Sequence, residues 1–526
     1  MKKNVLSLSI TAALVGFGFA GGAQAIGLDN PSATPIPPGA ATSLRTSLDG
    51  VGHFLYVPYY TAQGANNTMI NIVNTDSVNG KAVKVRFRGA ANSDDVFDFQ
   101  VFLSPNDVWT ASVTKNANGE TMLNTQDLSC TKPDKAQLNT TAFQTFRLDK
   151  LRTGDALLNE AREGYVEIFN MADIPPTNGA VTNALYTATT HVKGSPNTAP
   201  PCRTTPTTAA WTALEIDPLD TAAANAKGLY APTTGLFANW IILNATDAGA
   251  WSGAATAIAA VGLTGLPTTG AITYFPQTNQ GLGVNATASR ISLFTADPWL
   301  RANPSRAATY DLPDFSIPYT SSSDPTVQVS NLSGAIATRN IMNEFLTVSA
   351  INASTDWLLS MPTRRYSVAY DYNAKTVLYT VLPVQYFTPT NTTVIDRQVC
   401  ITGTSITVFD QEETTPTTPG AGVIISPQEP GKPTSFNICG EASVLSFNRG
   451  ESASASGLIT SASGTFKATV ARSAVDGPYA AGWANLATPG LSNGGLPILG
   501  YEAVRATSGA QSFGATLVHR TTRVQP

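Results

Sequence analysis

The feature that most constrains the fold is a repeated pattern of short β-branched and aromatic runs separated by turn residues. The clearest run is Ala82–Arg88, in which apolar residues at 83, 85 and 87 alternate with Lys84, Arg86 and Arg88. A period of two is typical of a β-strand with one buried and one solvated face. We therefore expect a half-buried antiparallel strand here, with its charged side chains in water.

The same pattern recurs along the chain, with turn signals every ten or so residues, as in β-sandwiches. Val78-Asn79-Gly80 reads as a hairpin turn, and Leu148–Arg162 is the best helix candidate. Further strands are expected at 53–60, 68–74, 96–103, 107–113, 164–171, 237–244, 271–275, 343–351, 356–361, 366–372 and 377–386. The predicted fold class is mainly β, with two or more β-sandwich-like units, few short helices and long loops tied by disulfides.

The N-terminus has the layout of a secretory signal peptide. Lys2 and Lys3 precede an uncharged apolar run over 5–20, and Ala23-Gln24-Ala25 is a small-x-small cleavage site. These features predict cleavage before Ile26 and export from a bacterial cell to the periplasm or the cell surface. No later stretch is apolar enough to predict a transmembrane segment in the mature chain.

Composition shifts suggest a domain plan. Residues 1–25 form the signal peptide, and 26–48 are expected to be an extended N-terminal segment. A first β-rich region is expected at 49–300 and a second at 301–526. The boundary is placed in the Pro-rich, polar stretch Asp297–Asp314.

Four cysteines, Cys130, Cys202, Cys400 and Cys439, fit an oxidising compartment. Four cysteines allow three pairings, and proximity in the sequence favours Cys130–Cys202 and Cys400–Cys439. These bridges would tie the bases of two Thr/Pro-rich loops, expected at Thr187–Pro218 and Gln411–Pro433.

The charge content excludes some function classes. Only 13% of the residues are charged, and the formal net charge is −4. No basic surface is available for phosphate, so a nucleic-acid partner is not expected.

Two groups of residues are candidate catalytic sites. Gly490-Leu491-Ser492-Asn493-Gly494 matches the nucleophile elbow of hydrolases, with Glu502 and His519 following in the order acid, base. Loop-forming residues on both sides of Ser492 favour a simple turn instead. Asp356 with Arg364 and Arg365 is a second candidate, but a solvated strand end explains the arginines better. We therefore expect no catalytic residues and no enzyme.

Acidic turns are the weak candidates for a cation. Asp94, Asp95 and Asp98 cluster, as do Asp311 and Asp314. Calcium prefers six to eight oxygen ligands, which such a turn could supply in part. A turn that caps its own backbone is the favoured interpretation, so no metal site and no cofactor are expected, with calcium left as a weak possibility.

The tryptophans are expected mainly in sandwich cores, since Trp109 and Trp357 lie in strand patterns. A carbohydrate-binding platform would need several exposed aromatic side chains on one face, which the sequence does not reveal.

Several segments resemble secreted cell-surface proteins of the Burkholderiales type, including S-layer-like proteins that sheathe outer-membrane tubes called nanopods. The segments are 55–61 (LYVPYYT), 72–75 (IVNT), 80–90 (GKAVKVRFRGA), 92–105 (NSDDVFDFQVFLSP), 107–111 (DVWTA), 343–345 (NEF), 355–357 (TDW), 361–365 (MPTRR) and 495–500 (GLPILG). The likeness touches both ends of the mature chain and carries no catalytic residues.

The resemblance implies a structural protein on the outer face of a bacterial outer membrane, assembling with copies of itself and contacting other surface components. The low charge agrees, because surfaces with few charges lose less solvation on packing together. The alternative is an adhesin or carbohydrate-binding surface protein.

Overall fold

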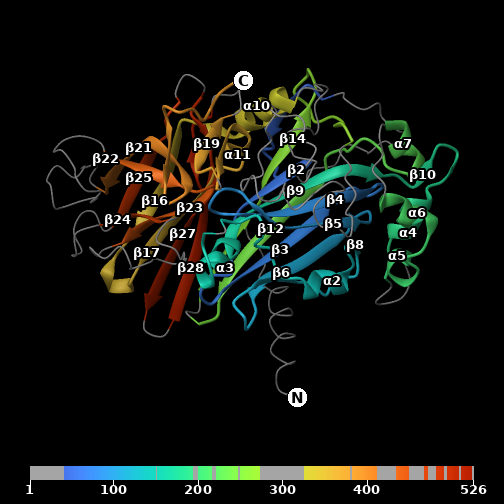
Figure 1. Ribbon diagram of the computed structural model, residues 1–526, viewed down its shortest axis with the longest axis horizontal. Coiled ribbons are helices and arrows are strands. Elements are labelled where there is room, and N and C mark those ends of the chain that lie inside the picture. Colours follow the sequence, from blue (N-terminus) through green and yellow to red (C-terminus); the bar gives the residue numbers. More distant parts are fainter. Residues whose placement is uncertain are drawn as a thin grey trace, which may run out of the picture. The chain divides into compact units, whose positions relative to one another are not determined.

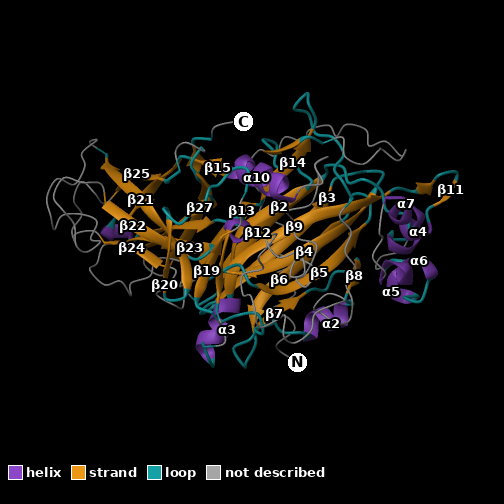
Figure 2. Cartoon of the chain, turned by 45° about the horizontal axis from the view of Figure 1, so that its top comes forward, coloured by secondary structure: helices purple, strands orange, loops and turns teal. Residues whose placement is uncertain are grey.

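The computed structural model describes residues 41–149, 151–192, 199–215, 221–246, 249–272, 325–372, 374–379, 382–411, 434–448, 467–471, 481–490, 494–508 and 511–523. Several predictions concern residues outside these ranges: the signal peptide, most of the segment 26–48, the boundary stretch 297–314 with Asp311 and Asp314, most of the loop 411–433, and Ser492. We call residues 41–272 the first half and 325–523 the second half. The fold is mainly β, as predicted (Figure 2).

Two sheets form the first half (Figure 1). Sheet I has seven strands in the order β1-β14-β2-β9-β4-β5-β8, and sheet II has five in the order β13-β12-β3-β6-β7. The strands of sheet I are β1 (Ser43–Thr46), β14 (Thr256–Val261), β2 (Phe54–Thr61), β9 (Glu163–Ile174), β4 (Gly80–Gly89), β5 (Asp95–Leu103) and β8 (Cys130–Lys132). Those of sheet II are β13 (Gly249–Ala254), β12 (Leu236–Asn244), β3 (Asn66–Asn74), β6 (Val108–Lys115) and β7 (Thr121–Asn124).

Two further sheets form the second half. Sheet III has the order β20-β21-β25-β16-β29, with β22 also paired to β21, and sheet IV has the order β24-β23-β17-β27-β28. The strands of sheet III are β20 (Thr392–Ile395), β21 (Gln398–Asp410), β25 (Ala481–Ala487), β16 (Asn340–Leu346), β29 (Arg520–Thr521) and β22 (Thr434–Cys439). Those of sheet IV are β24 (Lys467–Ala471), β23 (Ala442–Asn448), β17 (Ser354–Ser360), β27 (Leu499–Ser508) and β28 (Gln511–Val518).

Three two-stranded ribbons and short helices complete the described chain. The ribbons pair β10 (Thr177–Asn178) with β11 (Val181–Thr182), β15 (Ala337–Thr338) with β26 (Leu496–Pro497), and β18 (Val368–Asp371) with β19 (Thr376–Tyr379). The helices are α2 (Lys135–Thr140), α3 (Asp155–Ala161), α4 (Ala184–Thr189), α5 (Pro201–Thr204), α6 (Ala209–Thr212), α7 (Thr221–Ala226), α10 (Pro325–Ile336) and α11 (Arg364–Ser367), with 3₁₀ turns η1 (Ala213–Glu215) and η2 (Ser349–Ile351). The predicted helix 148–162 is thus reduced to α3. The expected loop 187–218 is partly helical, because it contains α5, α6 and η1.

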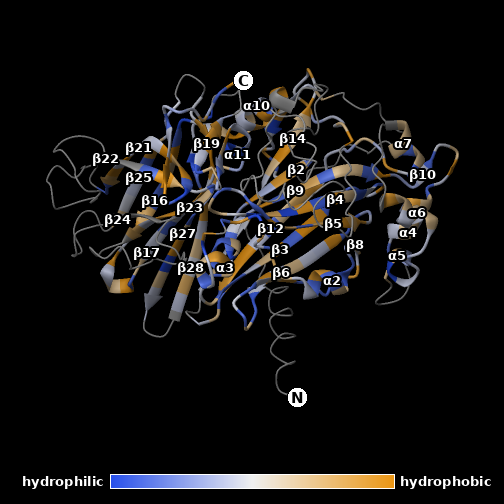
Figure 3. Ribbon diagram, in the orientation of Figure 1, coloured by the Kyte–Doolittle hydropathy of each residue, from blue (hydrophilic) through white to orange (hydrophobic). Residues whose placement is uncertain are grey.

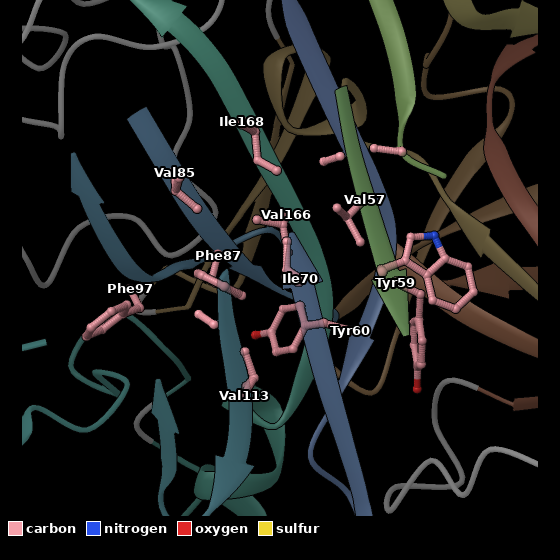
Figure 4. Close-up of a cluster of buried hydrophobic side chains, with 14 of the residues drawn as sticks. Val57, Tyr59, Tyr60, Ile70, Val85, Phe87, Phe97, Val113, Val166 and Ile168 are labelled. Atoms are coloured by element: carbon pink, nitrogen blue, oxygen red, sulfur yellow. The ribbon is translucent and has the colours of Figure 1, made fainter. Parts of the chain in front are cut away.

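Sheets I and II enclose the first hydrophobic core. Val57, Tyr60, Val85 and Val166 of sheet I meet Ile70 and Val113 of sheet II (Figure 4). The alternation of apolar and polar residues along the strands is visible in Figure 3. Burying one apolar face of each sheet against the other is the usual driving force of a sandwich.

The predicted hairpin at Val78-Asn79-Gly80 is wrong. The strand before it, β3, belongs to sheet II, and the strand after it, β4, belongs to sheet I. The Asp76 carboxylate accepts hydrogen bonds from the backbone N–H groups of Val78 and Asn79, each at 2.9 Å. The turn signal is real, but it carries the chain from one sheet to the other.

Sheet I is covered on its second face as well. Cys202 of α5, Trp211 of α6, and Val329 and Leu332 of α10 pack with Phe102 and Tyr165 of that face. A third core fills the space between sheets III and IV and includes Trp357, Phe447, Ile406 and Leu486. Sheet IV also faces the first half, because Leu358, Val444 and Tyr501 belong to the core of sheets I and II.

Candidate functional site: the polar junction and the outer faces

The charged side of β4 is buried, not solvated as predicted. Lys84 is 3% exposed, and Arg86 and Arg88 are fully buried. Neighbouring strands supply the partners: Arg88 Nε lies 3.1 Å from Glu167 Oε2 on β9, and Lys84 forms an ion pair with Asp98 on β5. The predicted alternation of the two faces is present, but the polar face is covered, and acidic residues on the neighbouring strands, each two positions from the register partner, pair with its charges.

The two arginines of α11 are also buried, which corrects the expectation of a solvated strand end. Each is 1% exposed. Arg364 Nε lies 3.2 Å from Glu441 Oε1, and its Nη2 donates to the backbone oxygen of Ala91 at 3.3 Å. Arg365 Nη2 lies 3.4 Å from Glu167 Oε1. The helix therefore joins the second half to the charged face of sheet I.

We call the polar contacts between sheet I and the second half the polar junction. The turn Ala90–Asp94 lies at its centre. The Asn92 amide donates to the Arg397 backbone oxygen at 2.9 Å and accepts from the Val399 N–H at 3.1 Å. The Tyr372 hydroxyl donates to Asp94 Oδ2 at 2.8 Å. The Asn92 side chain of the first half thus forms hydrogen bonds with backbone groups of Arg397 and Val399, which come more than 300 residues later in the sequence.

Burial sets the protonation of the junction carboxyls. It raises the pKa of Asp94 well above its usual value, with the Tyr372 hydrogen bond acting in the opposite direction. Burial also raises the pKa of Glu441, against the Arg364 charge, and raises the pKa of Glu160 to about 7, against the Arg152 charge. Asp94 contacts the other half directly, through the Tyr372 hydroxyl.

The acidic turn considered for calcium is engaged by protein donors. Asp95 Oδ2 lies 3.7 Å from Arg86 Nε and 3.6 Å from Arg147 Nη1, and Asp98 pairs with Lys84. Within the described ranges no three His, Cys, Asp or Glu side chains are grouped so that they could hold a metal ion.

Glu502 and His519, the candidate acid and base for Ser492, are buried in the second half: Glu502 lies on β27, and His519 directly follows the adjacent strand β28. Burial raises the pKa of Glu502 to about 8, with a smaller contribution from the Glu344 charge. Burial lowers the pKa of His519 to about 3. Glu502 is opposite Leu517 in the β27–β28 pair, and the His519 ring lies against Trp357, with ring centroids 5.0 Å apart. Asp356, on β17, is opposite Ala503 and Ser446 in sheet IV.

Both disulfides favoured by sequence proximity are present. Cys130–Cys202 joins β8 to α5, and Cys400–Cys439 joins the paired strands β21 and β22. They fasten the helical cover of sheet I and the edge of sheet III.

The tryptophans divide into core and surface. Trp109 and Trp357 are buried as predicted, at 1% and 0% exposure. Trp483 is 40% exposed and stacks on Phe409, with ring centroids 4.5 Å apart and an interplanar angle of 15°. The sequence gives only a weak signal for the exposure of Trp483. In the run Ala481–Ala487, Trp483 and Asn485 alternate with small and apolar residues.

Comparison with known proteins gives no relative: no protein-family model, curated protein or solved structure matches the chain. Across the described residues, no helix has the length and apolar character needed to cross a membrane.

Proposed function

We propose that this chain is a secreted structural protein of a bacterial cell surface, a self-assembling subunit of a surface layer or sheath. The N-terminal leader, the resemblance of the mature chain to S-layer-like proteins, and the mainly β fold with two disulfides support the proposal. In this role the protein reaches the outer face of the outer membrane, with copies of itself and surface components as partners.

The observation that carries the self-association is an apolar edge strand. On β28, Phe513 is 58% exposed, Leu517 45% and Val518 61%. Phe513 and Leu517 are four residues apart and project from the same face of sheet IV. Exposed apolar side chains gathered on one strand are typical of a surface that contacts another protein.

The distribution of charge favours the same role. Lys84, Arg86, Arg88, Arg364 and Arg365 are all buried, so these charges do not contribute to the surface. A surface depleted of charge repels its own copies weakly and loses little solvation when it packs against them. The polar junction therefore serves the proposed function indirectly, by placing charges inside the molecule.

The test is negative-stain electron microscopy of the mature protein, residues 26–526, with added calcium and with chelator. We expect sheets or tubes from the wild type, and none from Leu517→Lys. Leu263→Lys, which changes a 94% exposed leucine in a turn, is the matched control and should assemble. Monomers of the wild type under every condition would overturn the proposal.

A further inference from the structure

The outer face of sheet III carries a row of three side chains on neighbouring strands. Trp483 on β25 is the register partner of Phe409 on β21 and of Glu344 on β16. The next outward row joins Asn485 to Thr407 and to Met342. These strands lie side by side in Figure 1. Each row spans two inter-strand spacings, about 10 Å.

Trp483 differs from the other described tryptophans in its exposure. Trp109, Trp240, Trp251 and Trp357 are at most 1% exposed, against 40% for Trp483. Its strand neighbours Ala484 and Leu486 are fully buried, so the strand directs Trp483 away from the core. Leaving an indole in water forgoes a large hydrophobic gain, which is typical of a binding position.

The stacked ring on Phe409 holds Trp483 in place. With centroids 4.5 Å apart and planes within 15°, the two rings restrict each other's rotation. A side chain that is already ordered loses little conformational entropy when a ligand packs against it. The Phe409–Trp483 pair is therefore a preorganised platform.

We propose that this face binds a neutral carbohydrate chain. The C–H side of a pyranose ring is apolar and can pack on the indole, while its hydroxyl groups need polar partners nearby. Glu344 is exposed in the same row and accepts hydrogen bonds from hydroxyls through its carboxylate. Thr407, which is half-buried in the next row, offers a hydroxyl group. The carboxylate in the row disfavours acidic polysaccharides, so the ligand is uncharged.

This binding does not depend on self-assembly, since β28 and the row of Trp483 belong to different sheets. The assay is affinity electrophoresis of the mature protein in native gels that contain hydroxyethylcellulose, glycol chitin or dextran. The gels are run in both the wild-type and the Leu517→Lys background. The binding result can then be interpreted even if the protein does not assemble.

We expect at least one polymer to retard the wild type and Trp483→Ala to bind it at least about tenfold more weakly. Glu344→Gln should weaken binding by a smaller factor. Phe513→Ala, which removes an exposed aromatic ring from β28, should leave retardation unchanged. No retardation by any of the three polymers, or equal retardation of Trp483→Ala and wild type, would overturn the proposal.

Discussion

Arg397 and Asp149, which are 248 residues apart in sequence, form a two-point ion pair across the junction of the halves. Arg397 Nη2 donates to Asp149 Oδ1 at 2.8 Å, and its Nε donates to the other carboxylate oxygen. Arg397 lies in the turn between β20 and β21, and the same guanidinium donates to the Tyr372 backbone oxygen at 3.2 Å. A hairpin of the second half is thereby attached to a loop of the first.

Loss of this ion pair should weaken the molecule. Arg397→Gln leaves Asp149, which is 2% exposed in its side chain, without its charged partner. Since Arg397 is itself 22% exposed, we expect a loss of about 1–3 kcal/mol in the free energy of unfolding. Urea denaturation measures it, with exposed Arg520→Gln as the control. A change as small as that of the control would show that the pair contributes nothing.

Glu502→Gln should stabilise the protein at neutral and alkaline pH. The pKa of Glu502 is raised from 4.5 to about 8, so the folded state keeps a proton that the unfolded state has lost. Stability from this group therefore falls as pH rises from about 4.5 to about 8. We expect a gain of up to about 4 kcal/mol at pH 8 and almost none at pH 4. Equal effects at both pH values would contradict the raised pKa.

The two buried histidines should make the fold sensitive to acid. Burial lowers the pKa of His53 and of His519 from 6.5 to about 3. Each stabilising contribution is complete above pH 6.5 and is lost as pH falls towards 3, by up to about 3 kcal/mol per histidine at pH 4. Histidine NMR titration checks this. Two imidazole resonances should show no change between pH 8 and 5, and midpoints near 6.5 for all three histidines would refute it.

Removal of the Cys400–Cys439 disulfide should destabilise the second half. The bridge closes a 39-residue separation, for which the chain-entropy model gives about 4 kcal/mol. Cys400→Ser/Cys439→Ser is compared with wild type by thermal unfolding under oxidising conditions. When both proteins are measured in reductant, which also opens Cys130–Cys202, their melting temperatures should agree. A difference that persists in reductant would point to the substitutions themselves.

The strands could be predicted from the sequence more accurately than the elements that cover their faces. The alternation in β4 identified two faces correctly, because side-chain direction is a local property of the backbone. Whether the face with Arg86 and Arg88 meets water depends on Glu167 and Arg365, which are distant in sequence. No local pattern contains that information. The turn at Val78-Asn79-Gly80 shows the same limit, because its residues do not specify which sheet receives the next strand.

The candidate sites show the same difference between local properties, which the sequence predicts, and long-range properties, which it does not. Cys130 and Cys202 could be paired from their spacing, since a short separation favours closure. The exposure of Trp483 depends on which face of β25 meets sheet IV, a long-range property. The burial of Glu502 likewise depends on packing between sheets III and IV.

The strand pairing also has a consequence for the order in which the chain can fold as it emerges from its N-terminus. β15, β16 and β17 come early in the second half, yet β25, β26, β27 and β29, with which they pair, lie within the last 46 residues of the sequence. The first half can complete both of its sheets once Val261 has emerged. Some pairs of the second half, such as β18 with β19, β20 with β21 and β17 with β23, can form earlier. β15 and β16, in contrast, stay unpaired until nearly the whole polypeptide is present, because long-range pairs form only when both strands are available. If the chain is exported as proposed, these waiting strands are where a chaperone would be needed most.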